Sequence, residues 1–100
     1  MHIHNVYFWL KDGLSDEQKV TFEKGLMSLC LESNVETGHY GKPAEVDRSV
    51  SDNSFSFGLM LIFPHTAAHD RYQNESHVHD KFIEEHGSEW ERVVVYDMLV

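Results

Sequence analysis

The stretch FSFGLMLIF, residues 55–63, decides the fold because it is the clearest β-strand in this chain of 100 residues. Its aromatic and aliphatic side chains favour a strand, and Pro64 directly after it ends the run. Side chains alternate between the two faces of a strand. One face therefore carries Phe55, Phe57, Leu59, Leu61 and Phe63, and the other carries Met60 and Ile62. Both faces are apolar, so this strand needs a cover on each side.

Two further strands are predicted near the ends of the chain. The segment HIHNVYFWL, residues 2–10, is rich in β-branched and aromatic residues and is followed by the turn signal KDG. The segment RVVVYDMLV, residues 92–100, also has two apolar faces: Val93, Val95 and Leu99 oppose Val94, Tyr96, Met98 and Val100. A weaker segment, VETGHYGK at 35–42, is expected to form a short edge strand.

Helices are predicted between these strands. In LSDEQKVTFEKGLMSLCLES, residues 14–33, Ser15 and Gln18 form a capping-box pattern. The apolar face of this helix consists of Phe22, Leu26, Leu29 and Cys30. Two shorter helices are expected at 66–73 and 77–87. The segment PAEVDRSVSDNS, residues 43–54, is polar and rich in turn formers, so we expect a mobile loop there.

This order of elements, β-α-β-β-α-β, is that of the ferredoxin-like fold, an α+β arrangement with a four-stranded antiparallel sheet. The length suits one core, so residues 1–100 are expected to form a single domain. The helices cover only one face of the sheet. A second copy of the chain would cover the other face, and we therefore predict a homodimer whose sheets form a dimeric α+β barrel.

The composition argues against several partners and locations. The chain carries 17 acidic and 8 basic residues, a formal net charge of −9. Surfaces for nucleic acids or anionic membranes need clustered Lys and Arg, so neither partner is expected. The single cysteine, Cys30, cannot form an internal disulfide. No leader-like segment and no apolar run of about 20 residues is found, so we expect a soluble cytoplasmic protein.

Four stretches, taken in their order and spacing, resemble the stress-responsive α/β-barrel domain, called Dabb: HNVYFWLKDGLSDEQK, FSFGLMLIF, HDRYQNESHVHDKFIEEH and WERVVVYD. The resemblance covers essentially the whole chain and implies a dimeric α+β barrel. It extends distantly to olivetolic acid cyclase of plants. That enzyme closes a linear poly-β-ketone by aldol condensation with a histidine and a tyrosine and without a cofactor. Related monooxygenases of antibiotic biosynthesis use the same barrel.

The resemblance to the cyclase implies several site residues. Tyr72 stands where the cyclase has its tyrosine, and His4 stands where it has a first-strand histidine. Family members usually read His-Pro-x-His followed by x-x-Phe. Here SHVHDKF keeps the His-x-x-Phe half through His79, whereas Ser76 and His77 replace the usual His-Pro. His77 therefore competes with His79 for the same role.

Other positions match the family in part. Trp90 and Asp97 fit the ending W-E-x-x-x-x-x-D. Leu26 and Phe57 stand where the cyclase has a tyrosine and a third-strand histidine in its pocket, so the resemblance does not imply the same substrate. The candidate catalytic residues are His79 and Tyr72, and the candidate substrate-binding residues are His4, His77, Phe57 and Trp90.

The helical phase separates the histidines at residues 77–86. With Ser76 at the N-cap, one face carries His79, Phe82, Ile83 and His86, and this face is expected to meet the sheet. His77 falls on the solvated side, and His86 is interpreted as a packing residue or a helix-end cation. Near the helix N-terminus His79 should be neutral and able to accept a proton, with the Tyr72 hydroxyl as donor. The alternative is structural, with His79 bonded to a neighbour and Tyr72 packed under the helix.

Two histidine pairs have a spacing typical of metal ligands. His2 and His4 share one face of a strand, and His65 and His69 are four residues apart. No cysteine pair completes either set, so no metal site is predicted. No cofactor is expected, because the chain has no Gly-rich phosphate loop and no clear environment for an axial haem ligand.

Two functions remain open at this point. The first is a stress-associated homodimer that binds a small hydrophobic or aromatic ligand without chemistry. The second is a cofactor-independent cyclase-like, lyase-like or monooxygenase-like enzyme that acts on a polyketide-like or aromatic carbonyl compound. A closed pocket that contains both His79 and Tyr72 would separate them, since the enzyme requires it and the binding protein does not.

Overall fold

A computed structural model describes residues 1–100, and its seven elements follow the predicted order. They are β1 (His2–Leu10), α1 (Asp16–Cys30), β2 (Thr37–Gly41), β3 (Phe57–Phe63), α2 (Thr66–Glu75), α3 (His77–His86) and β4 (Trp90–Leu99). The helices α2 and α3 together fill the second helical position of the ferredoxin-like order. The predicted α+β fold class is confirmed.

The four strands form one antiparallel sheet in the order β2-β3-β1-β4. Strand β1 therefore lies between β3 and the edge strand β4. In this register His4 lies opposite Leu61 of β3 and opposite Asp97 of β4. Neighbouring residues directly across a ladder share a face, so His4 and Asp97 project from the same side of the sheet.

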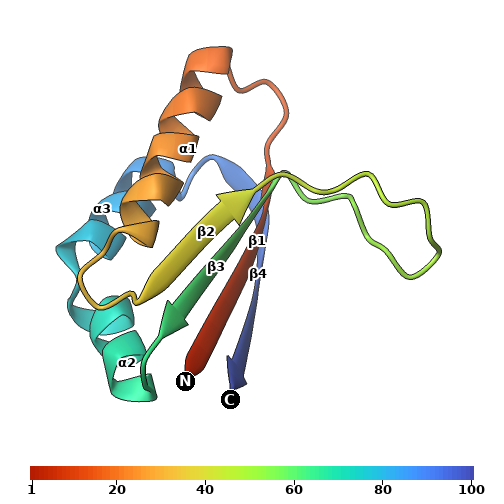
Figure 1. Ribbon diagram of the computed structural model, residues 1–100. Coiled ribbons are helices and arrows are strands. Elements are labelled where there is room, and N and C mark those ends of the chain that lie inside the picture. The colour runs from red at the N-terminus through yellow and green to blue at the C-terminus, as the bar shows by residue number, and fades with distance from the viewer.

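The helices gather on one side of the sheet, as Figure 1 shows. The covered face is buried in β1 and β3, where buried and half-buried residues alternate along each strand. The buried apolar core consists of Val6, Phe8, Phe22, Leu26, Leu29, Phe57, Leu59, Leu61, Phe63, Ala68, Tyr72 and Phe82. Strand β4 differs, because most of its side chains are exposed on both faces. The helical layer thus leaves this edge of the sheet largely uncovered.

Helix α1 begins as the sequence predicted. The Ser15 hydroxyl accepts a bond from the Gln18 backbone N–H, and the Gln18 side chain accepts one from the Ser15 backbone N–H. Gly25 lies where α1 meets α3, and a Cβ there would stand 2.9 Å from both His86 Nε2 and Phe82 Cδ2. Glycine is therefore required for the close approach of the two helices, which outweighs its weak helix propensity.

The prediction that Phe55 shares a face with Phe57 is wrong. Strand β3 begins at Phe57, two residues later than expected. Phe55 precedes the ladder, so the alternation of a regular strand does not extend to it. Its ring packs against Tyr7 at 5.0 Å and Trp9 at 6.5 Å between centroids, on the face that the helices leave open.

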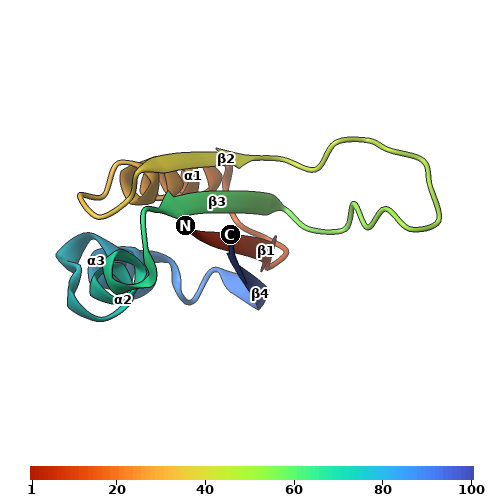
Figure 2. The same cartoon turned by 60° about the horizontal axis from the view of Figure 1, so that its bottom comes forward.

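The predicted boundaries differ from the structure by small amounts elsewhere. Strand β2 spans 37–41 within the expected 35–42, and β4 begins at Trp90, two residues before the expected start. The segment between β2 and β3 projects away from the sheet as a long loop, visible in Figures 1 and 2. Its mobility stays a prediction. None of the three helices is long and apolar enough to cross a membrane.

Candidate functional site

A mostly apolar cavity of about 460 Å³, partly open to solvent, lies between the covered face of the sheet and the helices. Its apolar wall includes Val6, Phe8, Leu29, Leu59, Phe82, Ile83, Val93 and Val95. The polar groups that line it are His4, His69, Tyr72, Gln73, His79 and Asp97. A concave apolar site with a few convergent polar groups is typical of small-molecule pockets, and this volume falls in their usual range.

Four of the six candidate site residues line this cavity: His4, Tyr72, His79 and Trp90. His77 does not, because it is exposed on the outer side of α3. Phe57 does not either, because its ring packs into the core against Phe22 at 5.6 Å between centroids. The structure therefore brings His79 and Tyr72 together and leaves His77 and Phe57 outside.

Tyr72 lies between two histidines. Its side chain is 2% exposed, and its ring meets His79 edge to face at 4.9 Å and His4 at 6.0 Å between centroids. Burial raises the pKa of Tyr72, and the negative charge of Glu32 adds to this effect. The hydroxyl is therefore protonated at neutral pH and can donate a hydrogen bond into the cavity.

His79 is half-buried in the first turn of α3, where its backbone N–H donates to the Ser76 hydroxyl at 3.2 Å. Its ring Nε2 lies 3.5 Å from the Gln73 side-chain nitrogen, whereas its buried Nδ1 has no hydrogen-bond partner. Desolvation lowers the pKa of His79, although Asp80 and Glu32 act in the opposite direction. The imidazole is thus favoured in its neutral form, which can accept a proton.

The predicted inward face of α3 is correct for Phe82 and His86, which are buried, and only partly correct for Ile83. Ile83 lines the cavity but is 45% exposed, since the uncovered edge strand β4 gives it nothing to pack against. His86 packs against Phe22 and Phe82, and its Nδ1 lies 2.5 Å from the Glu89 carboxylate. His86 is therefore a packing residue away from the cavity wall.

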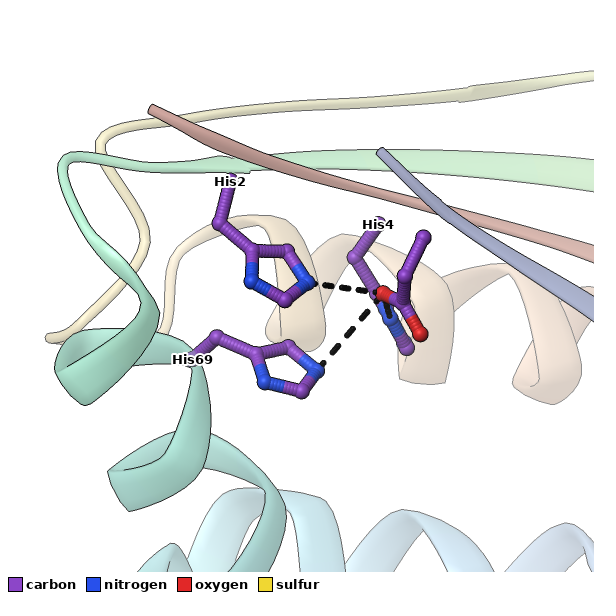
Figure 3. Close-up of side chains that lie close together, drawn as sticks. His2, His4 and His69 are labelled. Atoms are coloured by element: carbon purple, nitrogen blue, oxygen red, sulfur yellow. Dashed lines mark hydrogen bonds and ion pairs between the residues drawn. The ribbon is translucent and has the colours of Figure 1, made fainter. Parts of the chain in front are cut away.

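Three histidines converge on one carboxylate, as Figure 3 shows. We call His2, His4, His69 and Asp97 the histidine cluster. The Oδ1 of Asp97 lies 2.9 Å from His2 Nε2, 2.7 Å from His4 Nδ1 and 3.7 Å from His69 Nε2. The rings of His2 and His69 stack at 3.9 Å between centroids.

Three elements of the fold supply the members of the histidine cluster. His2 and His4 alternate onto the covered face of β1, and Asp97 is the ladder partner of His4 on β4. His69 enters from the second turn of α2. Although partial burial opposes it, hydrogen bonding from His2 and His4 lowers the pKa of Asp97. Burial lowers the pKa of His4 despite its bond to Asp97.

The four-residue spacing of His65 and His69 does not mark a metal pair, as the sequence analysis concluded. His65 caps α2, with its Nδ1 accepting a bond from the Ala68 backbone N–H at 3.1 Å, and it lies outside the cluster. The prediction of no metal site considered each histidine pair by itself and did not combine His2 and His4 with His69 and Asp97. Pairing β1 with β4 in the predicted sheet would have placed His4 opposite Asp97, and this pair would have located the cluster.

Comparison with known proteins places this chain in a family. Residues 3–100 match the family described as the stress responsive A/B barrel domain, Dabb. The chain belongs to the Dabb family. The match covers almost the whole chain, so the cavity and the histidine cluster lie within the Dabb domain, His2 being one residue before the matched range. No protein of curated function matches the sequence.

Solved structures show that this Dabb chain shares its fold with proteins of distant sequence. A protein from Arabidopsis thaliana is 21% identical with a TM-score of 0.82, over 100% of this chain and 95% of that one. A dimeric ferredoxin-like protein of unknown function from Thermobifida fusca is 13% identical with a TM-score of 0.78, over 99% and 90%. The hydroxynitrile lyase from Passiflora edulis is 18% identical with a TM-score of 0.79, over 99% and 92%.

Proposed function

We propose that this Dabb protein is a homodimer that binds a small, largely apolar carbonyl compound in the cavity of each subunit and that His79 and Tyr72 catalyse acid–base chemistry on it. The observation that carries this proposal is the presence of both side chains in one apolar cavity of about 460 Å³. A protein that served only as a structural dimer would have no need of such a cavity.

The homodimer is supported by the open face of the sheet. On β4 the side chains of Tyr96 and Met98 are 64% and 51% exposed and point away from the helices. Together with Tyr7, Trp9 and Phe55 they leave apolar area that a second sheet would cover. The similarly folded Thermobifida fusca protein is dimeric. The complementary surface in our proposal is therefore the same face of a second copy.

The chemistry follows from the two protonation states. Neutral His79 accepts a proton from the carbon next to the carbonyl group, and the electron pair left behind forms an enolate. The Tyr72 hydroxyl donates a hydrogen bond to the enolate oxygen, where the negative charge develops. An apolar cavity strengthens this bond, since little water competes for the oxygen. The enolate then takes back a proton or attacks a second carbonyl carbon.

One comparison supports the catalytic part of the proposal. A hydroxynitrile lyase shares this fold, so the same architecture hosts an enzyme in at least one relative. A cytoplasmic location is also proposed. It rests on Cys30, a half-buried cysteine with no disulfide partner in the chain.

The test is deuterium exchange into acetophenone, an aromatic methyl ketone, followed by the loss of its methyl proton signal in D₂O. Wild-type protein should accelerate exchange, and His79→Gln should lower the acceleration by about 100-fold or more. His77→Gln is the matched control, because it removes an exposed histidine two residues away. Exchange at the uncatalysed rate would reject the catalytic part. Chemical-shift changes at the cavity without exchange would leave a binding protein.

A further inference from the structure

We propose that His2, His4, His69 and Asp97 form a binding site for a divalent transition-metal ion, with Zn²⁺ as the best-suited ion. The ligand atoms of these four residues, three imidazole nitrogens and one carboxylate oxygen, all lie within 4.8 Å of one another. They come from β1, α2 and β4, so the whole fold holds them together. This site is separate from the acid–base pair of His79 and Tyr72.

The distances suit a tetrahedral ion. Bonds of about 2.0–2.1 Å place tetrahedral ligand atoms about 3.3 Å apart. The three nitrogens lie 2.9, 2.7 and 3.7 Å from the Asp97 oxygen, on both sides of that value. Closing the widest pair from 4.8 Å requires at most about 1.5 Å of side-chain movement, shared between two residues. Small rotations of the rings provide such movement without a change of the backbone.

His69 contributes the one ligand nitrogen of the cluster that is buried without a hydrogen-bond partner. Its Nε2 is buried, has no hydrogen-bond partner and points at the Asp97 oxygen. A buried nitrogen without a partner is costly, and most such atoms in folded proteins are satisfied. A metal ion bound among the four ligands would use this lone pair.

Outer hydrogen bonds already orient two of the rings. The His69 Nδ1 lies 3.1 Å from the Asp70 carboxylate, and the His2 Nδ1 lies 3.2 Å from the Thr66 hydroxyl. In both rings the opposite nitrogen, Nε2, faces the cluster. Metal-binding histidines usually hold their second nitrogen in this way, which fixes the ring and increases its basicity.

The ligand set selects the class of ion. Imidazole nitrogens with one carboxylate suit zinc and its neighbours in the first transition row, whereas Ca²⁺ and Mg²⁺ prefer oxygen ligands. Binding replaces the protons that His2 and His4 share with Asp97. His2 changes tautomer so that its Nδ1–H donates to Thr66, and His4 carries its proton on Nε2, so a ring with one proton keeps that proton when the metal binds. The site itself does not depend on the proposed carbonyl chemistry.

The test measures Zn²⁺ alone, by competition with a chromophoric chelator, on protein that carries no polyhistidine tag. We expect one ion per chain with micromolar or tighter affinity. His69→Ala should weaken binding by at least about 100-fold, and Asp70→Asn, which changes only an outer hydrogen bond, by about 10-fold or more. His77→Ala removes an exposed histidine outside the cluster and should leave the affinity unchanged.

A second measurement covers the case in which a variant fails to fold. On wild-type protein, Zn²⁺ should shift the imidazole NMR signals of His2, His4 and His69, and those of His39, His65 and His77 should not move. Millimolar binding, equal affinity in the folded His69→Ala and His77→Ala variants, or shifts at the control histidines would each overturn the proposal. Because the readout is metal binding, its failure would leave the deuterium-exchange result for His79 untouched.

Discussion

Replacing Tyr72 by phenylalanine separates the packing of its ring from the chemistry of its hydroxyl. The pKa of Tyr72 is raised by burial and by the nearby charges of Glu32 and Cys30, and no side-chain hydrogen bond contributes to it. The change to phenylalanine keeps the contact with Phe63, at 5.2 Å between ring centroids, and the contacts with His4 and His79. The free energy of unfolding should therefore change by less than about 1 kcal/mol.

Replacing Tyr72 by alanine provides the matched comparison. The ring is 2% exposed and belongs to the apolar core, so its removal should lower the free energy of unfolding by about 3–5 kcal/mol. Urea unfolding at a fixed protein concentration measures both variants, since the stability of a dimer depends on concentration. Deuterium exchange into acetophenone is measured on the folded Tyr72→Phe protein.

The two measurements distinguish a catalytic Tyr72 from a purely structural one. The catalytic hypothesis predicts near-wild-type stability for Tyr72→Phe together with an exchange rate lowered by about 100-fold. Exchange at the wild-type rate would show that the hydroxyl takes no part in the reaction. A loss of more than about 2 kcal/mol would show that the hydroxyl has a structural bond.

Three further predictions test the dimer, the charge state of His79 and the long loop. Light scattering should give about twice the chain mass of 11.6 kDa, and a wild-type monomer at micromolar concentration would contradict the dimer. Val94→Glu on the open sheet face should dissociate or unfold the protein. Val20→Glu on the exposed side of α1 is the control and should do neither. Burial lowers the pKa of His79 in the folded state, against the opposing charges of Asp80 and Glu32, so the unfolded state binds more protons. The free energy of unfolding should therefore fall as the pH drops below about 6.5 and level off below the folded-state pKa of His79. His79→Gln should reduce this slope in urea titrations, and an unchanged slope would refute a depressed pKa. Limited proteolysis should cut first within 43–54, and a first cut inside β3 would contradict a mobile loop.

The sequence predicted the features that depend on neighbouring residues. The capping box of Ser15 and Gln18 is local, and the faces of β1 and the regular part of β3 follow from alternation. The phase of α3 likewise separated the exposed His77 from the half-buried His79. These features need only the geometry of one helix or one strand.

The features that sequence reasoning missed depend on tertiary neighbours or on where a ladder ends. Phe55 was assigned to the wrong face because pairing begins two residues later. The histidine cluster joins residues up to 95 positions apart, and His69 belongs to it only because α2 packs beside the start of β1. Spacing along the chain pairs His69 with His65, which the structure uses as a helix cap.

The cavity and the histidine cluster share one physical origin, the uncovered edge of the sheet. Three helices cover β1 and β3, while β4 leaves Val93 and Val95 exposed beside the cavity. His4 belongs to both sites, since its ring lines the cavity and bonds to Asp97. A ligand that contacts His4 is therefore expected to alter metal affinity, and Zn²⁺ must alter the affinity of that ligand by the same factor. A carbonyl oxygen that binds the metal, or that accepts a hydrogen bond from the Nε2–H of metal-bound His4, raises both affinities, whereas a ligand that competes with the metal for His4 lowers both. Measuring acetophenone binding with and without Zn²⁺ gives the sign, and equal affinities would show that the cavity and the histidine cluster are not coupled through His4.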